Sequence, residues 1–188
     1  MGMATTYISS EEYLILERVA EVKHEYIDGE TVAMARVSPA HSLIAANVGG
    51  ELRNRLAGSC LVFDSSLRVS VNWGKLITYP AVSVVCGKVQ CVGDQRDVLA
   101  NPRLMVEVFS PSTNNYDRGE KPRLYRMMPS LAEFLLIEQC PIEIEHYRKL
   151  PNGHWEIEPI REAGAVIHLE SVNCDLPVSE VYRGVERL

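Results

Sequence analysis

The 188-residue sequence lacks any apolar run long enough to form a transmembrane helix, and it has no secretory h-region. It also lacks internal repeats, low-complexity tracts and linker-like segments. These absences exclude transmembrane-helix and repeat proteins, so we expect one domain over residues 1–188. We expect residues 1–3, Met-Gly-Met, to be a vector-derived remnant ahead of the native start.

Cysteine is scarce and widely spaced, and the chain has no CxxC pair and no Cys/His spacing typical of a zinc site. The five residues are Cys60, Cys86, Cys91, Cys140 and Cys174. This pattern supports neither a disulfide framework nor a structural zinc site. We therefore expect a reducing compartment, the cytoplasm.

Positive charge is also in short supply, because 19 Lys and Arg stand against 25 Asp and Glu, for a net charge of −6. Non-specific nucleic-acid binding depends on Lys and Arg that neutralise phosphates, so the chain is a poor general coat for DNA. Local basic clusters are still compatible with DNA binding. The clusters are Arg118, Lys121, Arg123 and Arg126, and separately Arg53 and Arg55. Solvated helix faces are the alternative explanation for both, and the one we favour for the second cluster.

Hydrophobic residues make up 46% of the sequence and charged residues 23%, as in ordinary globular proteins. Capping and periodicity predict helices from Ser9 to about Lys23, from Ser38 to about Leu56, from near Lys121, and briefly from Ser179. Strands are expected at 25–34 (a hairpin), 61–71, 76–86, 104–109, 134–137, 143–148, 154–160 and 166–169. This order predicts an α+β domain with a mixed sheet.

The stretch 104–125 contains the most informative pair of charged residues. Leu104 to Phe109 is an apolar run interrupted only by Glu107, and it predicts a buried strand. Alternate strand residues share a face, so Glu107 is expected beside Met105 and Phe109. A carboxylate in that position needs a partner, because an unpaired buried charge is costly.

A lysine follows one loop later. Asp117 and Glu120 have the spacing of a helix-start capping pair, and Lys121 then shares helical spacing with Leu124, Tyr125 and Met128. Pro122 is tolerable only in the first turn, so the helix is expected to begin near Lys121. Lys121 therefore faces inward in this prediction. The simpler alternatives are a structural ion pair with Glu107 or a lysine that reaches back to water.

Several motifs in order along the chain resemble one known family. They are KHEYIDGE, SPAHSLIAANV, TYP-x-VSVVCG, EVFSPST-x3-DRGEK and LP-x-SEVY. Together these motifs are similar to those of the Uma family of restriction-endonuclease-like proteins, a branch of the PD-(D/E)xK nuclease superfamily. The resemblance covers nearly the whole chain. It implies a restriction-endonuclease-like fold, in which helices flank a mixed central β-sheet.

The resemblance also implies a DNA endonuclease that uses Mg²⁺, with Mn²⁺ as a possible substitute. Hard cations prefer oxygen ligands, and the family's are an Asp, a Glu and a backbone carbonyl. Glu107 and the carbonyl of Val108 match two of them, and Lys121 matches the lysine that positions the attacking water. Phe109 stands where the superfamily more often has that lysine. Glu25 is implied to approach the site, although a surface position on its hairpin is an equal alternative.

One residue departs from the family pattern. The metal-binding Asp falls within TYP-x-VSVVCG, where this chain has Ala81, and alanine offers no oxygen to a metal. We expect weak Mg²⁺ binding and impaired catalysis as a result. Ala81 is either an engineered inactivation or a natural loss, and the sequence does not separate the two.

Two functional hypotheses follow, together with a weaker third. The first is a DNA endonuclease impaired at Ala81, expected to act as a homodimer because two-fold symmetry suits cutting both strands. The second is a catalytically dead homologue that acts as a dimeric nucleic-acid-binding or protein-binding module. The third is a structural polar core in a protein of unrelated function.

Overall fold

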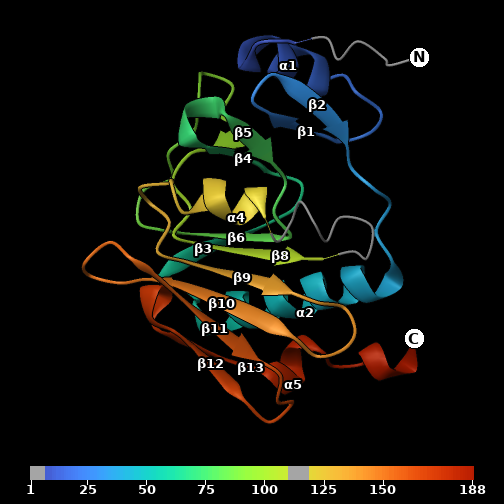
Figure 1. Ribbon diagram of the computed structural model, residues 1–188, viewed down its shortest axis with the longest axis vertical. Helices are drawn as coiled ribbons and strands as arrows, with labels where there is room; N and C mark the ends of the chain where they lie inside the picture. Colours follow the sequence, from blue (N-terminus) through green and yellow to red (C-terminus); the bar gives the residue numbers. More distant parts are fainter. Residues whose placement is uncertain (1–6, 110–118) are drawn as a thin grey trace.

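Two large β-sheets with helices between and around them make up the computed structural model, which describes residues 7–109 and 119–188 except for the side chain of Trp73 (Figure 1). The larger sheet has six strands in the order β11-β10-β9-β8-β6-β3. In chain order they are β3 Cys60–Asp64, β6 Val82–Cys86, β8 Leu104–Val108, β9 Glu133–Ile137, β10 Ile144–Lys149 and β11 Trp155–Ile160. Strands β8 and β9 are parallel and the other neighbours antiparallel, so the sheet is mixed, as the sequence predicts.

The second sheet has five strands in the order β2-β1-β5-β4-β7. They are β1 His24–Ile27, β2 Glu30–Ala33, β4 Arg68–Val71, β5 Leu76–Thr78 and β7 Val98–Leu99. A separate hairpin pairs β12 Val166–Leu169 with β13 Cys174–Pro177. The helices are α1 Ser10–Glu17, α2 Pro39–Arg55, α4 Glu120–Tyr125 and α5 Val178–Val181, with short 3-10 turns at Asn72–Gly74, Glu170–Val172 and Val185–Arg187.

These elements form layers, which Figure 1 shows from α1 at one end of the molecule to the β12–β13 hairpin at the other. One face of the six-stranded sheet packs against α2, α5 and the hairpin, and we name it the α2 face. The opposite face packs against α4 and the five-stranded sheet, and we name it the α4 face. Strand β8 contributes Val106 to the first face and Met105 to the second. This alternation is the one expected for a strand buried on both sides.

Two segments expected as single strands each pass from one sheet to the other. Residues 61–71 split into β3 and β4 at a turn where the carboxylate of Asp64 accepts the backbone N–H of Ser66 at 2.8 Å. Residues 76–86 split into β5 and β6 around Pro80, which has no N–H to donate to a ladder. The expectation of two long strands is therefore wrong, because turn chemistry interrupts each apolar run. The second crossing carries the chain from Thr78 in the five-stranded sheet to Ala81, which precedes β6 of the six-stranded sheet.

The first helix is shorter than expected and ends at Glu17 rather than near Lys23. The carboxylate of Glu17 accepts the backbone N–H of His24 at 2.8 Å, so the chain turns back into β1. Leu16 of α1 and Val19 beyond its end are 58% and 81% exposed. The short strands β7 and β13 were not expected, since each lies in a stretch without a long apolar run.

The expectation of no disulfide is also wrong. Cys60 of the edge strand β3 lies directly opposite Cys86 of β6, with the Cα atoms 4.2 Å apart, and the two are disulfide-bonded. Directly opposed residues of antiparallel strands come this close in the non-hydrogen-bonded pairs. The 26-residue separation of the two cysteines carries no local signal that would have revealed the pairing. None of the helices described is long and apolar enough to cross a membrane.

Candidate functional site

The site is built on the α4 face of the six-stranded sheet, where β8 carries Glu107. This residue is 8% exposed and lies in the position that strand alternation predicts. Above it, α4 begins at Glu120, so Pro122 falls in the first turn as predicted. Asp117, the proposed capping residue, lies outside the described residues. Lys121 is 4% exposed and turns inward together with Leu124, Tyr125 and Met128, as the helical spacing predicts.

Two carboxylates converge on this lysine. The Nζ atom of Lys121 lies 3.0 Å from Oε1 of Glu107 and 2.8 Å from Oε1 of Glu25. Glu25 belongs to β1, in the other sheet, and its side chain is only 10% exposed. The alternative that placed Glu25 on the surface of its hairpin is therefore wrong. Three charged groups from β1, β8 and α4, far apart in sequence, meet at one point between the two sheets.

A hydroxyl group donates to each carboxylate as well. Thr78 of β5 donates to Oε1 of Glu25, and Tyr125 of α4 donates to Oε1 of Glu107. Strands β1 and β5 pair Tyr26 with Ile77, so Thr78 comes opposite Glu25 one residue along the ladder. Sequence reasoning put Tyr125 on the inward face but did not identify it as a donor, and it missed Thr78. The only signal for Thr78 was a polar residue in a long apolar run.

The electrostatics of the cluster favour the charged form of Glu25. Burial raises the pKa of Glu25, but the Lys121 ammonium and the hydrogen bonds from Lys121 and Thr78 outweigh it, so the pKa lies below its usual range. Burial, together with the charge of Glu107, holds the pKa of Tyr125 well above its usual value. Tyr125 therefore stays protonated and acts as a hydrogen-bond donor to Glu107.

Ala81 lies beside this cluster in the ladder. Strands β6 and β8 are antiparallel with Val82 opposite Val106, so the next step of the register brings Ala81 opposite Glu107. Ala81 itself is just outside β6, is 6% exposed, and packs with the apolar cluster of the α2 face. Val108, whose carbonyl is a predicted ligand, ends β8 directly after Glu107.

The oxygen donors present do not make a complete site for Mg²⁺. Glu25 and Glu107 both face the ammonium of Lys121, and position 81 supplies no oxygen. Across residues 7–109 and 119–188, no group of three or more His, Cys, Asp or Glu is arranged to hold a metal ion. The carboxylate of Asp64, at the end of β3, accepts the backbone N–H of Ser66 in its own turn.

A second buried cluster supports β1, the strand that carries Glu25. The carboxylate of Glu17 accepts the Tyr79 hydroxyl at 2.8 Å and lies 3.0 Å from Nδ1 of His24. Tyr13 of α1 donates its hydroxyl to the carbonyl of His24 at 2.6 Å. These contacts fix His24 and Tyr79, the residues adjacent to Glu25 and Thr78. They therefore help to position the side chains of both site residues.

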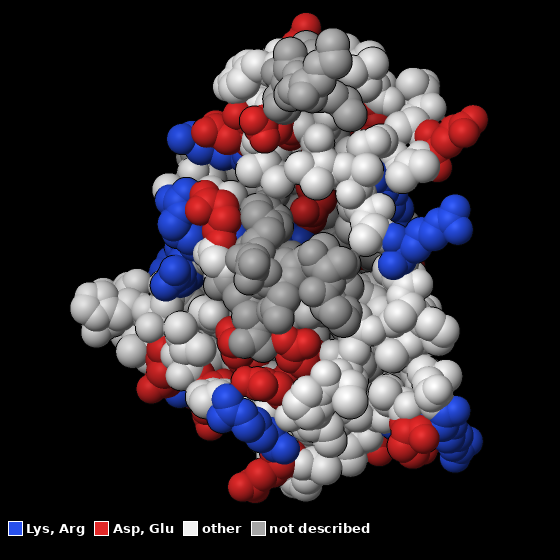
Figure 2. Space-filling view, turned by 45° about the vertical axis from the view of Figure 1, so that its right-hand side comes forward, with Lys and Arg blue, Asp and Glu red and all other residues white. Residues whose placement is uncertain are grey.

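The surface charge agrees with the composition. Arg123 pairs with Glu120 and Arg55 with Glu51, both as neighbours on one helix face, and Lys121 is buried. Arg118 lies outside the described residues. Figure 2 shows Lys and Arg interspersed with Asp and Glu among the coloured residues of the face it presents. Of the four basic residues expected to form a cluster, Lys121 and Arg123 therefore do not form a basic surface.

Comparison with known proteins places the chain in a family. The sequence model described as "Uma2: Putative restriction endonuclease" matches residues 10–179. The chain belongs to the Uma2 family. Two relatives come from Synechocystis sp. (strain ATCC 27184 / PCC 6803 / Kazusa), and both are named as uncharacterized proteins. Protein slr1290 is 37% identical over 184 residues, which cover 95% of this chain and 93% of that protein. Protein sll1609 is 31% identical over 169 residues, with 89% and 96% covered.

A solved structure shows that the fold of this Uma2 protein is shared. The crystal structure of "a putative nuclease belonging to DUF820" from Anabaena variabilis ATCC 29413 superposes with a TM-score of 0.76. It covers 95% of this chain and 99% of that one at 19% identity. The restriction-endonuclease-like α+β fold expected from the sequence is thereby confirmed.

Proposed function

We propose that this Uma2 protein carries the site of a Mg²⁺-dependent DNA endonuclease that Ala81 impairs. The observation that carries the proposal is the convergence of Glu25 and Glu107 on Lys121 from three separate elements. A structural ion pair needs only one carboxylate for each lysine. Two carboxylates around one ammonium, in a family described as restriction endonucleases, are better explained by a site for phosphodiester hydrolysis.

Each residue has a proposed role. Glu107 and the carbonyl of Val108 are ligands for Mg²⁺, or for Mn²⁺ in its place, and position 81 is where the third ligand belongs. Lys121 orients the attacking water, and Glu25 holds the lysine in place. When bound, the metal would stabilise charge on the phosphate and the leaving oxygen. Because Ala81 supplies no oxygen, we assign no metal-dependent step to the chain as it stands.

The test restores the missing carboxylate. In Ala81→Asp, a buried acid without a partner costs free energy of unfolding, and a bound cation removes that cost. We expect Mg²⁺ or Mn²⁺ to raise the thermal midpoint of Ala81→Asp but not that of the unchanged chain. Calorimetric titration should show metal binding to the variant, and plasmid DNA should be nicked.

The controls separate the site from the substitution itself. Adding Glu107→Ala or Lys121→Ala to Ala81→Asp should abolish cutting, whereas Ala81→Asn should neither bind metal tightly nor cut. If Ala81→Asp gains neither metal binding nor cleavage, the proposal of an impaired nuclease is wrong. The Glu107–Lys121 pair is then structural.

The remaining details of the function are also proposals. We infer that residues 1–188 act as one domain and that two copies form a homodimer, since two-fold symmetry suits a duplex cut on both strands. Sedimentation equilibrium tests the dimer. We propose the cytoplasm as its compartment; in that compartment the disulfide that joins Cys60 to Cys86 in the structure should be reduced. Thiol alkylation immediately on cell lysis, followed by mass spectrometry, distinguishes free from disulfide-bonded cysteine.

A catalytically dead binding module is the second candidate, and Ala81 is the observation that favours it. This hypothesis predicts that the unchanged chain binds duplex DNA or a protein partner without metal. DNA binding that is equal in the unchanged chain and in Ala81→Asp, with no cleavage by either, would select it.

A further inference from the structure

Strand β3 forms one edge of the six-stranded sheet, and its outer side is open. Within the described ranges its only neighbour in the sheet is β6. A hollow of about 740 Å³ runs beside this edge. Its lining combines residues of β3 with Arg53 of α2 and with Val89, Cys91 and Arg96 of the segment after β6. An open edge of this kind presents unpaired backbone groups that another strand can bind.

The register with β6 determines which backbone groups of β3 point to the open side. Cys60 and Cys86 are a non-hydrogen-bonded pair, because their Cα atoms are only 4.2 Å apart. Such pairs alternate along an antiparallel ladder, so Val62 and Val84 are a second one. In agreement, the carbonyl of Val84 accepts the N–H of Arg103, just before β8, at 2.7 Å. The N–H and C=O groups of Val62 therefore point away from β6.

The same alternation turns the backbone groups of Cys60 and Asp64 to the open side, but each has one group already in use. The N–H of Cys60 donates to the carbonyl of Leu56 at 3.3 Å. The carbonyl of Asp64 accepts the N–H of Leu67 at 3.3 Å. Four groups remain, namely the C=O of Cys60, the N–H and C=O of Val62, and the N–H of Asp64. None of these four has a hydrogen-bond partner in the part of the chain that the structure describes.

We propose that β3 pairs antiparallel with β3 of a second copy of the chain, around a two-fold axis at Val62. The two Val62 residues then exchange two hydrogen bonds. The N–H of Asp64 in each copy donates to the C=O of Cys60 in the other, because hydrogen-bonded pairs recur every second residue. All four open groups are used. The two occupied groups, the N–H of Cys60 and the C=O of Asp64, would face only each other, so the edge is complementary to itself.

The side chains of β3 fit the same register. Leu61 lies opposite Phe63 of the second copy, in a non-hydrogen-bonded pair, where side chains are closest. Leu61 is 52% exposed, and Phe63 is half-buried and packs against the α4-face core. Pairing would therefore cover each exposed leucine with an aromatic ring, twice over because the interface is two-fold symmetric.

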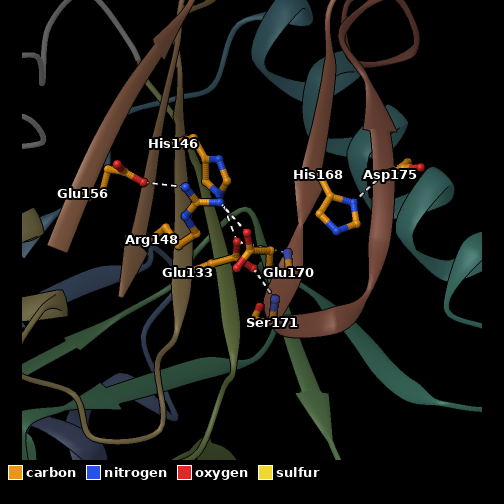
Figure 3. A network of polar contacts seen from close by, with 8 residues as sticks. All are labelled: Glu133, His146, Arg148, Glu156, His168, Glu170, Ser171 and Asp175. Atoms are coloured by element: carbon orange, nitrogen blue, oxygen red, sulfur yellow. Dashed lines mark hydrogen bonds and ion pairs between the residues drawn. The ribbon is translucent and has the colours of Figure 1, made fainter. Parts of the chain in front are cut away.

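The opposite edge of the sheet, β11, is protected against such pairing. It carries Glu156, Glu158 and Pro159, and charged residues and proline are the usual means of blocking an edge strand. Glu156 also binds Arg148 of the neighbouring strand β10 (Figure 3). In contrast, β3 has no proline and a single charged residue, Asp64, at its end. The edge suited to pairing is therefore β3.

This interface deepens the proposed function, because it rests on the homodimer proposed there and specifies where the two copies meet. A second copy is favoured over an unrelated peptide because the open donors and acceptors of β3 match their own two-fold image. The interface needs neither metal nor DNA. A failure of Ala81→Asp to cut DNA would therefore not affect it.

The test measures dimerisation of the whole chain by sedimentation equilibrium, from micromolar to millimolar concentrations. Val62→Pro removes the N–H that points to the open edge, a position where an edge strand tolerates proline. Because two hydrogen bonds of the dimer are lost, we expect its dissociation constant to rise at least about tenfold. Val62→Ala is the matched control, since it shortens the side chain but keeps the N–H, and it should have a smaller effect.

A second variant does not alter the backbone of β3. Leu61→Lys places a charge opposite Phe63 of the other copy and should also weaken the dimer at least about tenfold. Leu16→Lys is the matched control, because Leu16 is 58% exposed on α1, and it should leave the dissociation constant unchanged. Circular dichroism and the thermal midpoint show that each variant is folded.

Amide hydrogen exchange measured by NMR locates the contact. The N–H groups of Val62 and Asp64 should become protected only at concentrations where the dimer forms. Those of Leu61 and Phe63 face β6 and should be protected at every concentration. The proposal is overturned if the chain stays monomeric, or if Val62 exchanges equally fast in monomer and dimer. If a dimer forms and neither Val62→Pro nor Leu61→Lys weakens it, the β3 interface is wrong while the homodimer itself stands.

Discussion

Two buried polar clusters occupy opposite faces of the same six-stranded sheet, and they are stabilised differently. On the α2 face, the single carboxylate of Glu133 is met by two backbone N–H groups and by His146. On the α4 face, Glu25 and Glu107 share the ammonium of Lys121. The first cluster is held largely by backbone groups whose positions the fold already fixes. The second is held by side chains, namely the Lys121 ammonium and the hydroxyls of Thr78 and Tyr125.

This difference indicates which cluster is specialised for chemistry. Backbone donors stabilise a carboxylate without adding charge, so the Glu133 cluster is complete as a structural element. Two carboxylates and one ammonium carry a net charge of −1 when all are ionised. Burying these charged groups lowers the free energy of unfolding unless their interactions offset the cost of removing them from water. Buried charged groups with shifted pKa values are typical of functional sites.

The largest expected effect is the loss of the shared cation. Lys121→Met leaves two buried carboxylates facing each other, and breaking a buried ion pair in this way costs about 3–5 kcal/mol. We expect urea unfolding at neutral pH to show that loss of stability. Lys88→Met is the matched control, because Lys88 is exposed, and it should change stability by less than about 0.5 kcal/mol. A comparable loss of stability in both variants would mean that Lys121 stabilises the fold no more than an exposed lysine does.

The next effect tests the cluster on the other face. Glu133→Gln replaces a charged acceptor with an amide whose NH₂ group faces other donors, which costs about 1–3 kcal/mol. The cost is smaller than for Lys121→Met because no charge is left unpaired. Urea unfolding checks this value, with Glu30→Gln as the surface control. A loss larger than that of Lys121→Met would reverse the comparison drawn between the two faces.

The sequence predicted much of the α4-face site because its signals are local. Alternation in 104–109 and helical spacing after Lys121 each concern a few neighbouring residues, and they placed Glu107 and Lys121 on facing surfaces. Neither pattern identifies a partner in another element. Glu25 was assigned to the site only through the family resemblance, with a surface position as the equal alternative.

The sequence did not predict the features that depend on strand register. Thr78 meets Glu25, Cys60 meets Cys86 and Glu133 meets His146 because particular strands pair at particular positions. The pairing of Thr78 with Glu25 was not predicted because a single strand was expected at 76–86. Such a strand would keep Thr78 and Ala81 in one sheet. The strand predictions for 61–71 and 76–86 were therefore wrong at the turn residues that interrupt these apolar runs.

A smaller effect separates hydrogen bonding from charge in the α4-face cluster. Tyr125→Phe removes the hydroxyl that donates to Glu107 and keeps the buried ring, at a cost of about 1–2 kcal/mol. Denaturation measurements should show this loss in the unchanged background. In Lys121→Met the cost should be larger, because the hydroxyl then stabilises a carboxylate that has lost the lysine. Equal costs in both backgrounds would mean that Tyr125 and Lys121 act independently.

The last comparison is the response of the two clusters to acid. Glu25 and Glu133 both have a pKa below the usual value of 4.5, so each binds its proton more weakly in the folded chain than in the unfolded chain. Their contribution to stability is present above that value and is lost as the pH falls through the folded pKa. Glu25→Gln and Glu133→Gln should each make stability fall less steeply on acidification.

In Lys121→Met, acidification should change stability in opposite directions through Glu25 and through Glu133. Burial is already the largest single influence on the pKa of Glu25, and without the ammonium only the hydrogen bond from Thr78 opposes it. The pKa should then rise above its usual value, so mild acid should now stabilise the variant through that residue. Glu133 takes no stabilisation from Lys121, and its acid sensitivity should persist. Urea unfolding between about pH 7 and pH 3 measures both slopes. If Glu25→Gln still flattens the slope in the Lys121→Met background, the charge of Glu25 is stabilised by something other than the lysine.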